Sequence, residues 1–125
     1  MNGKLIDPPA IVIEAGYNMM QARRNWPDGD YLGKAIALVE EARDYMVKHY
    51  DVLEIQASET LYFLNEAAHA QIQHRAGNTT DDYRLAQGGH AIGRAHNAAR
   101  VGLQEAGFRP ITNSDFDNFG DGGSR

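Results

Sequence analysis

Apolar residues recur along most of the chain at intervals of three and four positions, which is the spacing of one face of an α-helix. One such stripe spans residues 31–50, with charged residues around it. Further stripes over residues 8–25, 51–75 and 80–106 predict three more helices. The stripe of the second helix consists of Leu32, Ala35, Ile36, Val39, Ala42 and Met46.

The start of the first helix carries two competing signals. Asp7 followed by Pro8 is typical of a helix start, because Asp accepts hydrogen bonds from first-turn N–H groups and proline fits the first helical position. The β-branched run at 11–13 instead favours a short strand, so residues 8–25 are helix or part strand, and we favour helix. Residues 25–30 form a clear turn. The helical face consists of Ile11, Ala15, Met19, Ala22 and Trp26.

Capping signals give the boundaries of the third and fourth helices. Asp51 with Glu54 three residues later resembles a capping box, so the chain either breaks at Asp51 or continues as one bent helix. Gly77 and Gly107 suit the left-handed position that follows a helix, and Pro110 lies just beyond the second of them. The apolar face of the third helix consists of Leu53, Ala57, Leu61, Leu64, Ala68 and Ile72.

Small residues dominate the apolar face of the fourth helix, which lets two helix backbones approach closely. Glycine inside a helix costs roughly 0.5–1 kcal/mol relative to alanine. Gly88, Gly89, Gly93 and Gly102 therefore require compensation, and close packing within the chain or between subunits is the simplest source. The face consists of Leu85, Gly88, Ile92, Ala95, Ala99, Gly102 and Ala106.

Together these elements predict an all-α fold, a single four-helix bundle-like domain over residues 1–107. Residues 108–125 are rich in glycine and aspartate and predict an extended or disordered acidic tail. Three phenylalanines in this tail are candidates for docking it on the body of the protein or on a neighbour; they are Phe108, Phe116 and Phe119.

The chain of 125 residues has the size of one domain, and its composition excludes several functions. The net charge is −5, with 12 basic against 17 acidic residues, so general nucleic-acid binding is not expected. Because there are no cysteines, a disulfide framework, a thiolate nucleophile and a zinc–cysteine site are excluded. The N-terminus lacks the apolar core of a signal peptide and no stretch reaches the ~18 apolar residues of a membrane span, so we expect a cytoplasmic protein.

Polar residues on the fourth helix form the strongest candidate site. His90, Arg94 and Asn97 have the i, i+4, i+7 spacing of one helix face, and His96 and Arg100 form a second pair beside them. Arginine can grip phosphate with two parallel hydrogen bonds, so we predict a site for a small anionic ligand, with no cofactor. The alternatives are a solvated polar face, ion pairs to the acidic second helix, or a half-buried His96. The candidate residues are Arg84, His90, Arg94, His96, Asn97 and Arg100.

Two patterns would point to an enzyme. Glu66 and His69 match the Glu-x-x-His pattern of di-iron helical bundles, but the second copy that such a site needs is missing, so we expect no metal. Arg84 and His90 have the Arg-x5-His spacing of helical RNases of the HEPN type, in which Arg and His perform acid–base work on a phosphodiester. Because neither set is complete, a non-enzymatic protein is favoured.

Two segments, Ala37–Arg43 and Glu66–Ile72, resemble small helical proteins of phages that sequester cyclic-nucleotide immune signals. The two segments are seven residues each in a chain of 125 and consist mainly of common helix formers. It implies an oligomer of short helices that binds nucleotides between subunits without cleaving them, as an anti-defence protein does. It assigns no ligand residue in this sequence.

The leading hypothesis is a non-enzymatic binding protein, a homo-oligomer that captures a small anionic, nucleotide-like ligand. An alternative is a protein–protein inhibitor or adaptor whose acidic surface and tail suit a basic partner. A further alternative is a metal protein or ribonuclease.

Overall fold

The computed structural model describes residues 5–50, 54–77 and 82–120, and these fold into helices joined by short connections. The part of the chain so described contains no strand, so the predicted all-α fold is confirmed and the strand alternative at 11–13 is wrong. None of the described helices is both long and apolar enough to cross a membrane. The helices are α1 (Ala10–Arg24), α2 (Tyr31–Tyr50), α3 (Glu54–Arg75), α4 (Asp82–Glu105) and the short α5 (Asn113–Gly120).

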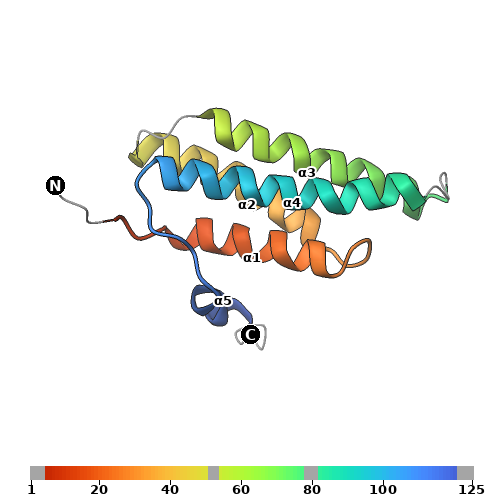
Figure 1. Cartoon of the computed structure of the whole chain (residues 1–125), viewed down its shortest axis with the longest axis horizontal. Helices are drawn as coiled ribbons and strands as arrows, with labels where there is room; N and C mark the ends of the chain where they lie inside the picture. The colour runs from red at the N-terminus through yellow and green to blue at the C-terminus, as the bar shows by residue number, and fades with distance from the viewer. Residues whose placement is uncertain (1–4, 51–53, 78–81, 121–125) are drawn as a thin grey trace.

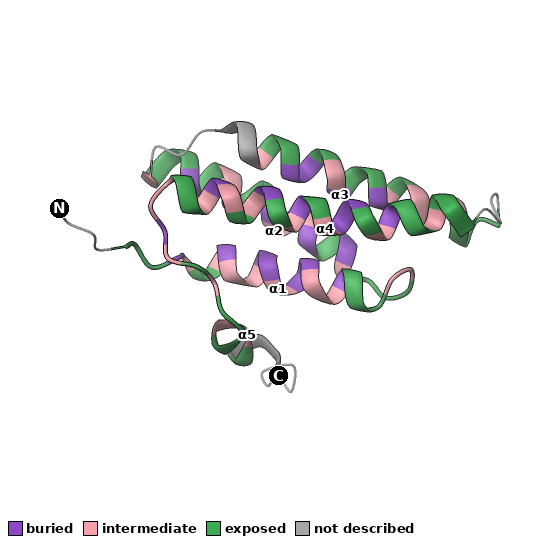
Figure 2. Cartoon of the chain, in the orientation of Figure 1, coloured by how far each residue is buried: buried purple, intermediate pink, exposed green. Residues whose placement is uncertain are grey.

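The four long helices lie along the molecule, and each packs on its neighbours in the chain (Figure 1). Contacts between α1 and α4 close the ring, so α2 and α4 are diagonal to each other. Figure 2 shows the buried residues on the sides of the helices that face one another. The centre of the bundle consists of Ala15, Met19, Ala22, Leu32, Ala35, Val39, Leu61, Leu64, Ala67, Ala91, Ile92 and Ala95.

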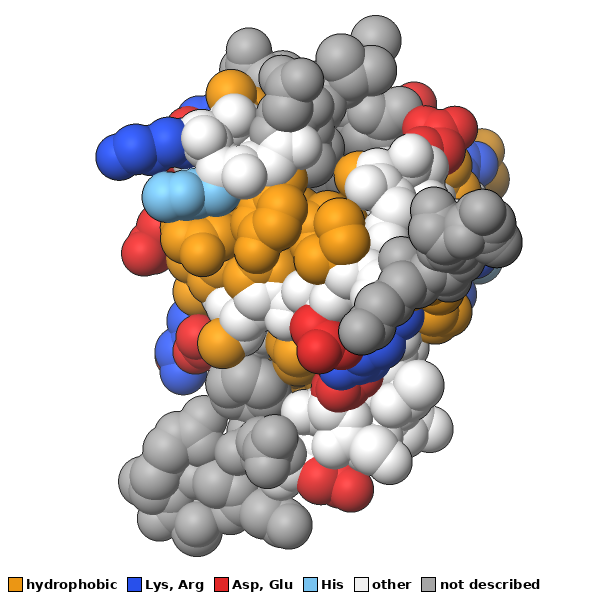
Figure 3. Space-filling model, turned by 90° about the vertical axis from the view of Figure 1, so that its left-hand side faces the viewer, with side chains coloured by type: hydrophobic (Ala, Val, Ile, Leu, Met, Phe, Trp, Pro, Cys, Tyr) orange, Lys and Arg blue, Asp and Glu red, His pale blue; other side chains and the backbone are white. Residues whose placement is uncertain are grey.

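A second apolar cluster lies at the end of the bundle where α4 leads into the C-terminal segment. Phe108 is 2% exposed there and packs edge-on against Tyr50, with ring centroids 5.0 Å apart. Val12, Ala42 and Met46 complete the buried part of this cluster. Figure 3 views this end of the molecule and shows apolar side chains gathered on its surface. The prediction that a tail phenylalanine docks on the body is therefore confirmed for Phe108.

Asp7 does not cap the first helix, contrary to the sequence-based prediction. The helix begins at Ala10 after Pro9, which makes no side-chain capping hydrogen bond. The first-turn N–H groups of Val12 and Ile13 instead donate to the backbone oxygen of Pro9. Proline restricts the residue before it to extended conformations, so the pair of prolines delays the helix and frees the Asp7 carboxylate for another partner.

The inner face of α3 differs in part from the predicted one. Ile72 is 62% exposed, whereas Thr60 and Ala67 are buried beside Leu64. The difference arises because α3 packs on both α2 and α4, so its buried face is centred between these helices. The chain forms two helices here rather than one bent helix, while the predicted cap at Asp51 lies outside the described residues.

Trp26 lies in the turn after α1, within the turn predicted at 25–30, and packs on α4. Its indole ring covers Gly88 and Gly89, and its Nε1 donates a hydrogen bond of 2.8 Å to the backbone oxygen of Leu85. A Cβ atom at Gly88 would overlap the ring, and one at Gly89 would lie 3.2 Å from Cδ1. The predicted compensation for these glycines is therefore found within the chain.

The turn between α1 and α2 is also bonded to α3. Gln71 Nε2 donates to the backbone oxygen of Pro27 at 2.6 Å, and Arg75 Nη2 donates to that of Gly29 at 2.7 Å. The turn therefore contacts both α3 and α4. This arrangement fixes where the last turn of α1 lies on the bundle.

The C-terminal segment is extended over residues 108–112 and then forms α5, where the sequence predicted no helix. Thr112 and Asp115 form one half of a capping box, because the Thr112 N–H donates to Asp115 Oδ2 at 2.8 Å. This Thr-x-x-Asp pattern is the signal that the sequence interpretation missed. Phe116 of α5 then lies 3.7 Å from the position of a Cβ on Gly16.

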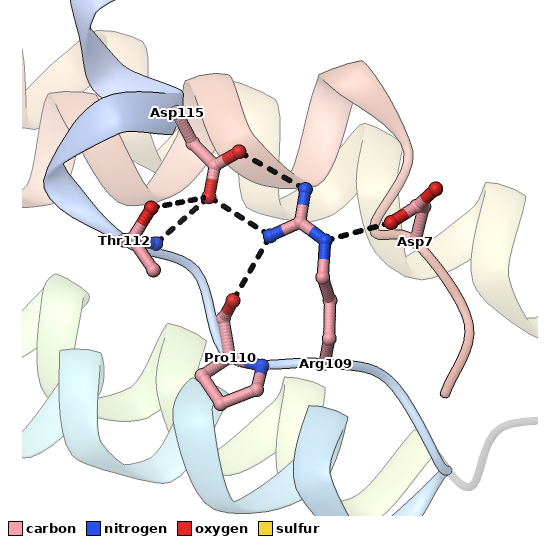
Figure 4. Close-up of polar contacts among 5 residues, drawn as sticks. All are labelled: Asp7, Arg109, Pro110, Thr112 and Asp115. Carbon is pink, nitrogen blue, oxygen red and sulfur yellow. Dashed lines mark hydrogen bonds and ion pairs between the residues drawn. The ribbon is translucent and has the colours of Figure 1, made fainter. Parts of the chain in front are cut away.

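Arg109 ties both ends of the chain together (Figure 4). Its Nη1 and Nη2 each donate to one carboxylate oxygen of Asp115 at 3.0 Å, and its Nε donates to Asp7 Oδ1 at 2.7 Å. These bonds to Arg109, with the Thr112 N–H, lower the pKa of Asp115 to about 2, and the carboxylates raise the pKa of Arg109. Asp115 is therefore ionised throughout the neutral range.

Gly88→Ala should destabilise the protein, because the added methyl group overlaps the Trp26 ring. We expect a loss of about 1–3 kcal/mol, the usual consequence of overpacking. The control is Gly33→Ala in α2, where an added Cβ meets nothing within 4 Å. The control should stabilise by ~0.5–1 kcal/mol through helix propensity. Urea denaturation measures both, and equal effects of the two substitutions would contradict the close packing.

Asp115→Asn should detach α5, because it removes the charge that Arg109 binds and weakens the cap on Thr112. Hydrogen exchange followed by mass spectrometry should show faster exchange over 113–117 in this variant, with the bundle unchanged. Asp117→Asn, an exposed position in the same helix, is the control and should exchange as the parent protein does. Unchanged protection of α5 in Asp115→Asn would show that the ion pair is not needed.

Candidate functional site

The polar stripe of α4 lines an open groove of about 710 Å³. His90, Arg94 and Asn97 come from α4, at the predicted helical spacing. The neighbouring helices supply the remaining groups, which are Glu59 and Phe63 from α3 and Arg23 from α1. The sequence therefore predicted that these three residues share one face of α4, and the packing of α4 between α1 and α3 forms the groove.

The groove forms because small residues lie between longer ones on α4. Gly93 and Ala98 line it beside Arg94 and Asn97, whose side chains extend outward. A glycine at 93 also lets the last turn of α1 come close. The same small residues that permit close helix packing therefore leave room for a ligand beside it.

Arg23 is a residue of the candidate site that the sequence interpretation missed, as it missed Glu59 and Phe63. Its guanidinium lies over Gly93, where a Cβ atom would overlap Nη1 and lie 3.0 Å from Cζ. Gly93, a glycine within the polar stretch of α4, was the sequence signal for a close contact at this place, but it did not identify Arg23 as the contacting residue. Only the docking of the α1–α2 turn brings Arg23 to this place.

A second groove of about 380 Å³ adjoins the first on the other side of Arg23. It shares Arg23 and Gly93 with the first groove and contains His96 from α4. Its apolar wall consists of Met19, Met20 and Ile92, and Arg24 completes it. The Arg23 guanidinium therefore lies at the boundary of two neighbouring cavities.

Basic side chains outnumber acidic ones in the two grooves, although the protein as a whole is acidic. Arg23, Arg24 and Arg94 line the two grooves, while the whole chain carries a net charge of −5. Within the described part of the chain, Arg23 and Arg94 form neither a hydrogen bond nor an ion pair. Guanidinium groups that form no bond within the protein can bind an anionic ligand with charge-assisted hydrogen bonds.

His96 is half-buried, in agreement with the alternative noted from the sequence. Burial lowers its pKa below the usual value, and the positive charges of Arg100 and Arg23 lower it further. His96 is therefore mainly neutral at pH 7. Its ring acts there as a hydrogen-bonding group rather than as a cation.

Two predicted site residues lie outside both grooves. Arg100 donates from Nη2 to Asn97 Oδ1 at 2.8 Å, so it orients the Asn97 amide rather than lining the cavity. Arg84 is exposed near the start of α4 and lines neither groove. The alternative of ion pairs to the acidic α2 has no support for Arg94 and Arg100, because α2 and α4 are diagonal in the bundle and neither arginine is in an ion pair among the described residues.

The structure does not assemble the residues of the enzyme alternatives. Glu66 and His69 are exposed, and the described residues contain no group of three His, Asp or Glu side chains that could hold a metal ion. His90 lines the groove whereas Arg84 does not, so the pair of the ribonuclease spacing does not share this cavity. Comparisons of the chain with protein families, with curated proteins and with solved structures find no match.

His96 should make the stability depend on pH. Because its pKa is lowered in the folded protein, its contribution is complete above the unfolded value of 6.5 and is lost as the pH falls through the folded value. Urea denaturation between pH 7.5 and about pH 5 should show this loss in the parent protein. His96→Gln should reduce it, and the exposed control His69→Gln should not. Identical pH profiles for all three proteins would contradict this assignment.

Proposed function

We propose that this protein binds a small phosphate-bearing ligand of the nucleotide class in the groove between α1, α3 and α4. The observation that carries the proposal is the convergence of Arg23 and Arg94, from different helices, on one cavity of about 710 Å³. Cavities of 300–1,000 Å³ are typical of small-molecule sites. Two guanidinium groups so placed suit a phosphate, which each of them can bind with two parallel bonds.

The other groups of the groove suit the rest of a nucleotide. The Asn97 amide and the His90 ring can hydrogen-bond to phosphate or ribose oxygens, and Phe63 offers an aromatic surface. The role that we propose is capture of the ligand without turnover. Sequestration of a nucleotide signal, the function that the sequence resemblance implies, is the biological use that fits such capture.

The alternative role as an acidic adaptor has less support. Asp115, one of the tail acids that would bind a basic partner, is already paired with Arg109. A tail-mediated interaction would therefore have to compete with a bond inside the chain. Self-association, which the resemblance implies, stays a prediction that native mass spectrometry can test.

Arg23→Ala and Arg94→Ala should each weaken ligand binding about tenfold or more, because each removes a charge-assisted bond to phosphate. Isothermal titration calorimetry with inorganic pyrophosphate and adenosine diphosphate measures the effect. Both positions are exposed, so circular dichroism should show an unchanged fold. Arg43→Ala in α2 is the matched control, because Arg43 is paired with Asp44 and lines neither groove.

Affinity that is equal in all four proteins would contradict the assignment of the groove. Added salt should weaken binding to the parent protein, because exposed charges are screened. Chromatography of the nucleotide after incubation tests capture against turnover. Recovery of intact adenosine diphosphate agrees with capture, and release of its products would contradict it.

A further inference from the structure

The Glu59 carboxylate would not contribute to binding a ligand that consists of an anion alone, such as phosphate. Among the described residues that line the larger groove, it is the one acidic side chain, and it is exposed there. A carboxylate repels phosphate, so its presence weakens binding unless another part of the ligand uses it. Glu59 therefore indicates a ligand that has an anionic end and a second end that donates hydrogen bonds.

The position of Glu59 shows which part of the ligand it would meet. It lies on α3 four residues before Phe63, so the two side chains are neighbours on one helix face. Arg23 comes from α1, and Arg94 from the α4 helix that lies between α1 and α3. The groove therefore has a cationic side, and a side with an aromatic ring next to a carboxylate.

An ionised carboxylate accepts hydrogen bonds and donates none. Guanine offers two adjacent donors on its pairing edge, the N1–H and the N2 amino group, which match the two oxygens of one carboxylate. Adenine offers one amino group beside the N1 acceptor, whose lone pair would face the carboxylate. Aromatic rings stack on either base, so Phe63 alone does not distinguish them.

We propose that Glu59 selects a guanine nucleotide, with the base stacked on Phe63 and its N1–H and N2 amino groups bonded to the carboxylate. Arg23 and Arg94 bind the phosphate at the opposite side of the groove. This inference rests on the proposed function and adds the identity of the base. It makes Glu59 a residue that determines specificity for the base, whereas Arg23 and Arg94 supply the affinity for phosphate.

The test compares guanosine monophosphate, adenosine monophosphate and pyrophosphate by isothermal titration calorimetry. We expect the parent protein to bind the guanine nucleotide about tenfold or more tightly than the adenine nucleotide, the worth of one or two charge-assisted hydrogen bonds. Glu59→Gln should bring the two affinities together and leave pyrophosphate binding unchanged or tighter. Glu66→Gln, at an exposed glutamate of the same helix outside the groove, should keep the preference.

A second variant separates the base from the phosphate. Phe63→Leu keeps an apolar side chain at a half-buried position and should weaken both nucleotides without weakening pyrophosphate. Equal affinity of the parent protein for the two nucleotides, or a guanine preference that survives in Glu59→Gln, overturns the inference alone. Failure of pyrophosphate and of both nucleotides to bind overturns the proposed function as well.

Discussion

The packing of Trp26 on Gly88 and Gly89 holds the turn between α1 and α2 against α4. The ring comes from the turn between α1 and α2 and rests on α4, and its N–H bonds to the Leu85 carbonyl 59 positions away in the chain. Because two glycines leave no side chain there, the ring reaches the helix backbone. The bonds from Gln71 and Arg75 then hold the same turn on α3.

The proposed site depends on this contact. Arg23 lies about one helical turn before Trp26, and Gly93 lies about one turn after Gly89. Because α1 and α4 run in opposite directions, the contact of Trp26 with Gly89 also places Arg23 over Gly93. Small residues thus set the distance between α1 and α4, and the long side chains around them line the grooves. A change at Gly88 would therefore alter the proposed site without substituting a residue that lines it.

The opposite end of the molecule is held by charge rather than by close packing alone. Arg109 binds Asp7, 102 residues earlier, and Asp115, six residues later. Phe108 anchors the same segment in the apolar cluster with Val12 and Met46. The buried ring of Phe108 and the guanidinium of Arg109 thus position the segments around Asp7 and Asp115 on the bundle. The cap at Thr112 then starts α5.

The sequence by itself determined the features that depend on neighbours along the chain. Helical periodicity gave the bounds of α2, and Gly77 and Gly107, with φ of 72° and 95°, end α3 and α4 as predicted. The spacing of His90, Arg94 and Asn97 placed them on one face, because 3.6 residues per turn is a local property. Only the tertiary structure decided which residues meet across helices. No pattern of neighbouring residues indicates that Arg23 lies over Gly93, or that Glu59 and Phe63 lie beside α4. These contacts depend on how whole helices pack against one another.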